Sequence, residues 1–502
     1  MHNDPIKTQY PHAEFLVTLI AHMTSSEFKK EAYKIVDFMV NYMESIEEYP
    51  VKSQVKPKEI LDQLPDDMPL SAEPMDEIMS DFREIIMPGI THWQHPNFYA
   101  YFQANVSPPS ILAEMLTATL GVQGMKWETS PASTELEEKM MSWLARAIQL
   151  PDEWQGVIQS TASDSTLCAI LTARERQSNF RINEQGFNTS QTYRVYCSTE
   201  THSSAEKAAK IAGIGKHNVV KVGTDHQLAL SPEQLEEFIR QDLVAGHIPL
   251  CVMATLGTTS TLAMDPLEAI SEITSRFNIW LHIDAAYAGS ALILPEYQEL
   301  IAGIHRADSF VFNPHKWLFT NFDCSAYFVK DAEALKNTFA ILPEYLKTST
   351  DSVVNNHCDW GIPLGRRFRS LKLWFVLRYY GLIGLQEILK AHIEMARWLE
   401  QHIVDHVDFE LMISRSMNLV CFRWHPSGID AEEQLELFNQ KLLNKINASG
   451  KLYLTHTRID EKLTLRMSIG QLKVTLDHVR DSWHTIVNTC ETIPYDEATA
   501  SV

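Results

Sequence analysis

Two apolar segments of the chain end in residues that can do chemistry. Leu281-His282-Ile283-Asp284 ends in a carboxylate, and Ser309-Phe310-Val311-Phe312 leads into Asn313-Pro314-His315-Lys316, which ends in an amine. Such β-rich runs are typical of buried parallel strands, and open α/β sheets bind ligands at the carboxyl ends of these strands. A lysine that can form a Schiff base and an aspartate that can keep a pyridine nitrogen protonated are what a pyridoxal phosphate (PLP) site requires. A buried Asp284–Lys316 ion pair would explain the same residues without a cofactor.

An expected helix N-terminus upstream of this pair could bind a phosphate. A short strand at 157–158 is followed by Ser160-Thr161-Ala162-Ser163-Asp164 and then by an expected helix over 165–176. Small hydroxyl residues at the start of a helix leave backbone N–H groups free for an anion, which the helix dipole also favours. The same residue types are common N-caps, so an ordinary cap is the alternative. The order of this segment relative to Asp284 and Lys316 favours the phosphate site.

Three further polar residues follow expected strands or lie beside the lysine. His202 comes shortly after the strand at 193–197, and its flat ring could stack on a pyridine and reach a substrate carboxylate. The chain has 20 histidines, however, and a single one is more often structural. Thr259 lies in Gly257-Thr258-Thr259-Ser260, which could also be a plain turn. His315 could bind a phosphate or orient Lys316.

Composition and charge exclude several classes of function. A chain of 502 residues is too long for one compact core, so two or three domains are expected. The formal net charge of −21 argues against a nucleic acid or an anionic membrane as partner. Seven scattered cysteines without a C-x-x-C pair suit a reducing cytosol and argue against a structural zinc site. The apolar run at 15–20 is too short to span a membrane, and we expect a cytoplasmic protein.

The pattern of apolar residues predicts the order of the elements. A helix is expected from Ser25, behind the capping signal Thr24-Ser25-Ser26-Glu27, and a second helix over 75–86. From about residue 108, helices alternate with short apolar strands, which predicts a mostly parallel, doubly wound sheet. A small α+β domain is expected from about residue 386. The expected strands are 157–158, 193–196, 219–222, 250–253, 279–283, 310–312, 419–422 and 463–467.

Longer motifs surround these features. Three of them are Asn313-Pro314-His315-Lys316-Trp317, His282-Ile283-Asp284-Ala285-Ala286-Tyr287-Ala288-Gly289 and Ile362-Pro363-Leu364-Gly365-Arg366-Arg367-Phe368-Arg369. Together they resemble the group II PLP-dependent amino-acid decarboxylases, and most closely the aromatic-L-amino-acid and histidine decarboxylase branch. The motifs Thr91-His92-Trp93, 130–137 and 452–457 are similar to the same branch. The resemblance runs from about residue 23 to about residue 486.

The resemblance implies a fold and an assembly. The fold would be α/β, the PLP-dependent transferase fold type I (aspartate-aminotransferase-like), with a mostly parallel seven-stranded sheet. An N-terminal helical segment and a small C-terminal α+β domain would flank it. The implied parts are an extension at 1–22, a helical dimerisation segment at 23–107, a large PLP-binding domain at 108–385 and a small domain at 386–502. The protein would be a homodimer with its active sites at the subunit interface.

The resemblance also implies roles for individual residues. Lys316 would be the Schiff-base lysine and Asp284 the partner of the pyridine nitrogen. His202 would stack on the ring, with Ala286 against the opposite face. The remaining cofactor contacts would come from Thr161, Ala162, Ser163, Asn313 and His315 at the phosphate, with Thr259 lining the site. The implied reaction converts an L-amino acid to its amine and CO₂ through a Schiff base and a quinonoid intermediate.

The sequence departs from the family in an expected lid at 346–360. Aromatic decarboxylases usually carry a tyrosine three residues before the lid tryptophan, which is Trp360 here, but this chain has His357. Within the family, loss of that tyrosine is associated with aldehyde-forming oxidative deamination. A histidine can still donate a proton near neutral pH. We therefore expect decarboxylation with His357 as the acid, and an aldehyde synthase is the main alternative.

The expected substrate pocket departs as well. Tyr101-Phe102-Gln103-Ala104 stands where the branch usually has a proline, often followed by a hydroxyl residue. Gln123 and Met125, expected to come from the neighbouring subunit, occupy positions that are commonly apolar or aromatic. Trp93, Tyr101 and Phe102 remain as an apolar wall, which favours a neutral, bulky side chain. Tryptophan, tyrosine, dihydroxyphenylalanine, phenylalanine and histidine all remain possible substrates.

Three other classes are less consistent with the sequence. An aminotransferase or desulfurase of the same fold type would not explain the motifs at 313–317 and 362–369. A cofactor-free structural protein would not need Lys316, Asp284 and His202 together. A nicotinamide site at Ala212-Gly213-Ile214-Gly215 lacks the third glycine and the preceding strand, so this segment is expected to be a turn.

Overall fold

The computed structural model describes residues 23–187, 191–341 and 354–494. The internal contacts of the chain divide it into two compact units, residues 1–92 and 93–502. The expected extension at 1–22 and most of the expected lid lie outside the described residues. The domain boundaries expected near residues 107 and 385 remain predictions.

The first unit contains two amphipathic helices, α3 (Ser25–Glu44) and α4 (Met75–Asp81). The predicted capping box is confirmed, because the Glu27 N–H donates to Thr24 Oγ1 at 3.3 Å and the Thr24 N–H donates to Glu27 Oε2 at 2.8 Å. Phe38 of α3 packs edge-on against Phe82, 5.6 Å between ring centroids. Several apolar side chains of α3 stay exposed, namely Phe28, Tyr33, Ile35, Val36 and Val40. This unit therefore buries little apolar surface within itself.

The second unit is built on a seven-stranded sheet with the strand order β1-β7-β6-β5-β4-β2-β3. The strands are β1 (Gln155–Gln159), β2 (Tyr193–Ser198), β3 (Val219–Val222), β4 (Ile248–Thr255), β5 (Trp280–Asp284), β6 (Ser309–Phe312) and β7 (Ser325–Val329). The neighbouring strands β3, β2, β4, β5 and β6 are all parallel to one another, whereas β7 is antiparallel to both of its neighbours, β1 and β6. The predicted mostly parallel α/β sheet is confirmed. The alternation of strands and helices does not predict β7, because no crossover helix separates it from β6.

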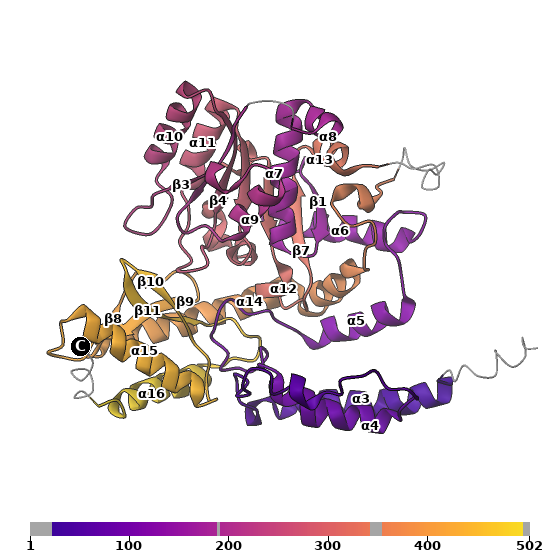
Figure 1. Ribbon diagram of the computed structural model, residues 1–502, viewed down its shortest axis with the longest axis vertical. Coiled ribbons are helices and arrows are strands. Elements are labelled where there is room, and N and C mark those ends of the chain that lie inside the picture. The colour runs from indigo at the N-terminus through magenta and orange to yellow at the C-terminus, as the bar shows by residue number, and fades with distance from the viewer. Residues whose placement is uncertain (1–22, 188–190, 342–353, 495–502) are drawn as a thin grey trace, which may run out of the picture. The chain divides into compact units, whose positions relative to one another are not determined.

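Helices cover both faces of this sheet. Helices α7 (Ala162–Ser178), α9 (Ser204–Ile211) and α13 (Ala332–Phe339) pack on one face, and α10 (Pro232–Val244) and α11 (Leu267–Phe277) on the other (Figure 1). The alternation along β4 shows the pattern, since Val252 and Ala254 join one core and Cys251 and Met253 the other. The remaining helices of this region are α5 (Pro108–Leu120), α6 (Pro131–Ala147), α8 (Arg181–Gln185) and α12 (Pro314–Trp317).

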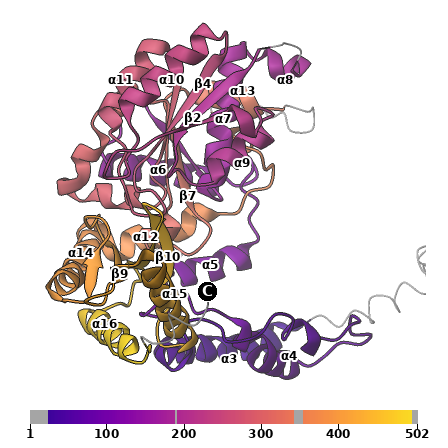
Figure 2. The same cartoon turned by 60° about the vertical axis from the view of Figure 1, so that its left-hand side comes forward.

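A second, antiparallel sheet follows, with the strand order β10-β11-β9-β8. Its strands are β8 (Phe409–Leu411), β9 (Leu419–Trp424), β10 (Thr455–Ile459) and β11 (Lys462–Ser468). The long helix α14 (Arg369–Asp405) leads into it and is kinked at Gly381, where φ is 65°. Helices α14, α15 (Glu432–Ala448) and α16 (Leu476–Glu491) pack around this sheet and share its apolar core (Figure 2). Among the helices described, none combines the length and apolarity needed to cross a membrane.

Gly289, which follows β5, packs so closely against its neighbours that its replacement should affect stability. A Cβ added at Gly289 would lie 2.4 Å from Phe312 Cβ and 3.2 Å from Ala285 Cβ, so neighbouring backbone would have to move. We expect Gly289→Ala to destabilise the fold by about 1–3 kcal/mol through overpacking. The matched control is Gly384→Ala in α14, where the added Cβ would meet only Tyr380 Cβ at 3.8 Å. Alanine favours that helix by up to about 1 kcal/mol. Urea unfolding of both variants measures this, and equal midpoints would contradict it.

Candidate active site

The sheet brings Asp284 and Lys316 together at neighbouring strand ends. Asp284 is the last residue of β5, and Lys316 lies in the short helix α12 directly after β6. Strands β5 and β6 are parallel neighbours, with Asp284 opposite Val311. Asp284 is 8% exposed and lies close enough to Lys316 and His202 for its charge to oppose the lowering of the pKa that burial causes in each. These three residues, which are far apart in the sequence, therefore share one site.

Lys316 carries an amine suited to act as a nucleophile. Burial lowers the pKa of its amine, and the Asp284 carboxylate only partly opposes that effect. Its Nζ lies 5.8 Å from the centroid of the Phe102 ring. A lysine held in such surroundings presents more of the unprotonated amine near neutral pH, which is the form that attacks a carbonyl carbon.

A backbone hydrogen bond fixes Asp284, and a neutral histidine lies two residues before it. The Ala286 N–H donates to Asp284 Oδ1 at 3.0 Å, so the turn after β5 holds the carboxylate. His282 lies on the same side of β5, fully buried, with its Nδ1 2.9 Å from Ser309 Oγ. Burial lowers the pKa of His282 to about 4, so this ring is neutral at pH 7. Asp284 can therefore hold a proton on a ring nitrogen of a ligand.

His202 lies four residues after the end of β2 and is exposed. Its Nδ1 accepts a hydrogen bond from the Ser204 N–H at 3.1 Å, so the neutral ring carries its proton on Nε2. Partial burial and the nearby Lys316 lower the pKa of His202, although Asp284 opposes them. The ring is therefore a neutral, flat donor at the open side of the site.

The expected phosphate site is a well-formed helix N-terminus. Thr161 caps α7, because the Asp164 N–H donates to Thr161 Oγ1 at 3.3 Å and the Thr161 N–H donates to Asp164 Oδ2 at 3.1 Å. The N–H groups of Ala162 and Ser163 come next, and no carbonyl of the described chain accepts from them. They can therefore donate to an anion that the helix dipole also attracts.

Asn313 and His315 add two polar groups at the end of β6. The Ser325 hydroxyl donates to Asn313 Oδ1 at 2.7 Å, which leaves the amide nitrogen of Asn313 available. The Cys324 N–H donates to His315 Nδ1 at 2.9 Å, so the neutral ring carries its proton on Nε2. Burial, reinforced by Lys316, lowers the pKa of His315 to about 3. Both side chains can therefore donate hydrogen bonds without adding charge.

Two arginines also fix segments of the site, and the sequence had not assigned a role to either of them. Arg369 donates to Ser160 Oγ at 3.1 Å while Asp323 binds its guanidinium at 2.9 Å. Arg466 donates to the carbonyls of Thr259 and Ser260, both at 2.6 Å, and so fixes the loop after β4. Arg369 was visible within a family motif, whereas nothing in the pattern around Arg466 marks it.

An aromatic stack supports the site from below. The ring of Phe102 stacks on Tyr287 at 4.0 Å, and Tyr287 stacks on Trp317 at 5.0 Å. Trp93 stacks on Tyr101 at 5.8 Å, and the Tyr101 hydroxyl lies 3.2 Å from that of Tyr453. Of the residues expected to line the substrate pocket, Phe102 is thus the one placed directly at Lys316. The neighbouring Ala104 is half-buried, and its carbonyl accepts from Gln94 Nε2 at 2.7 Å.

Gln123 and Met125 lie against another segment of their own chain. Gln123 Oε1 accepts from the Arg366 N–H at 2.6 Å, and the Met125 carbonyl accepts from the Cys358 N–H at 2.9 Å. Within the described residues, no hydrogen bond or ring contact joins either residue to Lys316 or Asp284. Their expected contribution to a neighbouring subunit's pocket remains a prediction.

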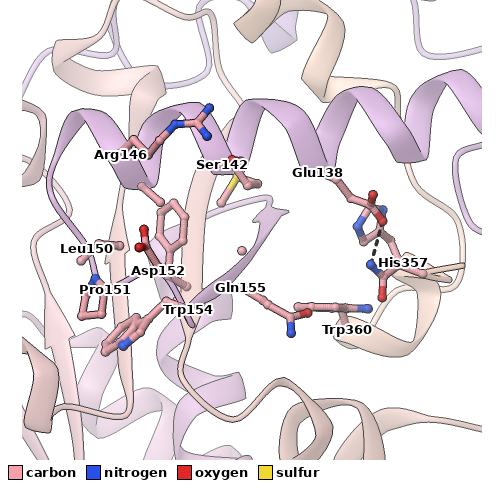
Figure 3. A pocket seen from close by; sticks show the side chains of 15 residues that line it. Glu138, Ser142, Arg146, Leu150, Pro151, Asp152, Trp154, Gln155, His357 and Trp360 are labelled. Atoms are coloured by element: carbon pink, nitrogen blue, oxygen red, sulfur yellow. Dashed lines mark hydrogen bonds between the residues drawn. The ribbon is translucent and has the colours of Figure 1, made fainter.

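His357 occupies a buried position beside α6. Its Nδ1 lies 4.0 Å from Glu137 Oε1, and among the described residues neither ring nitrogen has a hydrogen-bond partner. Burial lowers its pKa to about 4, with Glu137 opposing that effect. With Glu138 and Trp360 it lines a pocket of about 390 Å³ to which neither Lys316 nor Asp284 contributes (Figure 3). The expected role of His357 as an acid remains a prediction that the single subunit does not test.

The donor set fits a ligand that carries an aldehyde, a pyridine nitrogen and a phosphate. Lys316 offers the amine, Asp284 the carboxylate, and the start of α7 free N–H groups. Neutral Asn313 and His315 could add hydrogen bonds to the phosphate, and His202 offers a flat ring. No part of this set clashes in charge with such a ligand.

Comparison with known proteins agrees with this fit. A model of the pyridoxal-dependent decarboxylase conserved domain matches residues 57–425. The chain is 43% identical over 474 residues to a phenylacetaldehyde synthase of Arabidopsis thaliana, which covers 92% of this chain and 96% of that protein. It is 42% identical over 471 residues to tyrosine decarboxylase 2 of Narcissus pseudonarcissus, with coverage of 92% and 93%.

A solved structure gives the same answer. The tryptophan decarboxylase of Catharanthus roseus, in complex with L-tryptophan, superposes with a TM-score of 0.89 at 39% identity. The match covers 94% of this chain and 100% of that one. The predicted fold type and cofactor are confirmed. The chain belongs to the pyridoxal-dependent decarboxylase family and is a PLP-dependent carboxy-lyase.

Proposed function

We propose that this chain removes the α-carboxylate of an aromatic L-amino acid, releasing the corresponding amine and CO₂. The observation that carries the proposal is the buried Lys316 amine beside Asp284, at adjacent ends of β5 and β6. Bound PLP supplies the electron sink for the pair of electrons left when the carboxylate departs. The protein supplies position, proton placement and exclusion of water.

Each residue of the site would have one task in this reaction. Lys316 Nζ would bind the aldehyde carbon of the cofactor until the substrate amine displaces it. Asp284 would hold a proton on the pyridine nitrogen, which keeps the ring electron-poor. His202 would lie on the ring and donate its Nε2–H to the substrate carboxylate, while Ala286 would pack against the other face.

The cofactor's phosphate would be held by hydrogen-bond donors that carry no positive charge. The N–H groups of Ala162 and Ser163, with the Thr161 cap, would bind it at the start of α7. Neutral Asn313 and His315 would donate two further hydrogen bonds. Thr259 would line the site on the loop that Arg466 fixes.

An aromatic substrate suits the walls of the site. The Phe102 ring faces Lys316, and Trp93 and Tyr101 form a stacked pair along the same segment. The relatives are named for phenylacetaldehyde, tyrosine and tryptophan. Phenylalanine, tyrosine and tryptophan are therefore the first substrates to test, with dihydroxyphenylalanine and histidine after them.

An aldehyde synthase is the second candidate function. One relative is a phenylacetaldehyde synthase, and this chain has His357 where the resembling decarboxylases usually have tyrosine. In that reaction the amino acid, one O₂ and one water would be converted to the aldehyde, CO₂, ammonia and hydrogen peroxide. His357 as a proton donor to Cα would favour the amine instead.

We also propose that the chain acts as a cytoplasmic homodimer. Helix α5 leaves four apolar side chains exposed, namely Leu112, Met115, Leu116 and Leu120. An exposed apolar patch of this kind is typical of a protein interface. Gln123 and Met125 follow α5 directly, so a second copy seated there would receive them. All seven cysteines are free thiols, which suits a reducing compartment.

Covalent trapping tests the role of Lys316. After PLP is added and the protein is reduced with borohydride, we expect a stable adduct on the peptide that contains Lys316, read by mass spectrometry. Lys316→Arg should abolish the adduct, because it removes the nucleophile. It should also lower the activity at least about 10³-fold. Lys330→Arg is the control, since Lys330 lies at the surface, where its amine donates to the His305 carbonyl. An adduct on a different lysine, with activity retained in Lys316→Arg, would refute the assignment.

Product analysis tests the reaction and the role of His357. We expect the wild type to yield amine from an aromatic amino acid, and His357→Phe to raise the ratio of aldehyde to amine, because phenylalanine cannot donate a proton. His357→Tyr should lower that ratio. His305→Phe, at an exposed histidine, should leave it unchanged. Mass spectrometry of the products with a peroxide assay measures the ratio, and an unchanged ratio in His357→Phe would show that His357 is not the acid.

A charged residue introduced into the exposed apolar side of α5 tests the proposed dimer. Leu116→Lys places an ammonium in the proposed interface and should shift the protein from dimer to monomer. Leu243→Lys in α10 is the control, because Leu243 is 46% exposed and Leu116 is 47% exposed. Light scattering after size-exclusion chromatography measures the mass. A monomeric wild type, or a dimer that survives Leu116→Lys, would count against this interface.

A further inference from the structure

Four buried side chains bind the turn that follows β11. This turn, residues 468–471, joins the small sheet to α16. Gln103 Nε2 donates to the Ser468 carbonyl at 2.6 Å, Asn418 Nδ2 to the Ile469 carbonyl at 2.9 Å and Asn105 Nδ2 to the Gly470 carbonyl at 2.8 Å. The His392 ring hydrogen-bonds the backbone of Gln471. Each of the four side chains is at most 1% exposed.

Asn105 joins this turn to the catalytic segment. Its Nδ2 also donates to the Lys316 carbonyl at 2.8 Å, and its backbone N–H donates to the His315 carbonyl at 3.2 Å. Its Oδ1 accepts from the Leu472 N–H at 3.0 Å. Both donors and the acceptor of this buried amide are therefore used, on two segments that are more than 150 residues apart.

His392 makes a parallel connection through the next residue. Trp317 Nε1 donates to His392 Nδ1 at 3.0 Å, and the two rings are within 9° of parallel. Because an indole N–H can only donate, Nδ1 is the acceptor and the neutral ring carries its proton on Nε2. That tautomer matches the bond to Gln471. Burial lowers the pKa of His392 to about 3, so this arrangement persists at neutral pH.

The turn can come this close because residue 470 is glycine. A Cβ at Gly470 would lie 2.4 Å from the Tyr287 hydroxyl and 2.7 Å from Gln103 Oε1. Gln103 stands where the resembling family usually has a proline, which has no side-chain donor. The contact between the turn and the segment at 102–105 is therefore a built feature of this chain.

We propose that Asn105 is a positioning residue for Lys316, with His392 as its second support. It touches none of the reacting atoms, but it fixes the backbone from which the lysine side chain extends. The inference rests on the proposed function, because it matters only if Lys316 Nζ must reach the cofactor. A displacement of about 1 Å at a reacting group can cost about 10²-fold in rate.

The chain offers a matched control in Asn439. This amide is also 0% exposed and also makes three side-chain hydrogen bonds, to the Trp424 N–H and to the Trp424 and Leu435 carbonyls, each at 2.8 Å. All of its partners lie in β9 and α15. Replacing either asparagine by alanine removes the same number and kind of hydrogen bonds. Only Asn105→Ala removes a hydrogen bond to the backbone of Lys316.

The test compares Asn105→Ala with Asn439→Ala in the PLP-loaded enzyme. Both should lower the melting temperature by a similar amount. Only Asn105→Ala should lower kcat, about 10- to 100-fold, with KM changed less than about threefold. It should also change the visible absorption of the bound cofactor and slow PLP labelling of Lys316. If Asn105→Ala does not fold, His392→Phe, which keeps a ring but removes the acceptor for Trp317, should give the same pattern.

Two results would overturn the inference. Equal losses of kcat in the two alanine variants would show an effect of stability alone, and an unchanged kcat and cofactor spectrum in Asn105→Ala would show no effect at all. Either result leaves wild-type labelling at Lys316 intact, so the proposed function would survive. If the proposed function were wrong, the outcome would be different: the wild-type protein itself would not be labelled at Lys316.

Discussion

The structure depends on keeping a lysine amine and a carboxylate together in a largely buried site. Taking either charge out of water costs several kcal/mol, and the pair recovers that cost only when its geometry is well fixed. Lys316 and Asp284 meet because β5 and β6 are parallel neighbours whose carboxyl ends open at the same edge. The resulting amine has a lowered pKa, which suits the nucleophile of a PLP enzyme. The rest of the site serves to hold this pair in place.

The surrounding groups avoid adding further charge. His282, His315 and His392 are all buried, and burial lowers the pKa of each to between about 3 and about 4. Each is therefore neutral at pH 7, and the donors to Nδ1 of His315 and of His392 fix the tautomer of these two rings. The two nearby arginines are bound by carbonyls or by Asp323, so they fix loops instead of competing with Lys316 for the cofactor.

The sequence was most informative where one strand or helix end determines the chemistry. Asp284, Lys316 and the cap at Thr161 follow from local patterns, and the structure places them as expected. Strand β7 was missed because it returns from β6 without a crossover helix. Asn105 and Arg466 could not be assigned roles, since their partners lie hundreds of residues away and no periodicity links them. For His357 the sequence marks the departure from the family, and the structure places it in a buried pocket apart from Lys316, so its role stays a prediction.

A crystal structure of the protein with PLP would show whether Lys316 and Asp284 bind the cofactor together. We expect continuous electron density from Lys316 Nζ to the aldehyde carbon of the cofactor, with the Asp284 carboxylate within hydrogen-bonding distance of the pyridine nitrogen. The phosphate should then lie at the N–H groups of Ala162 and Ser163. A cofactor bound elsewhere, or bound here without a bond to Lys316 and with Asp284 turned away, would contradict it.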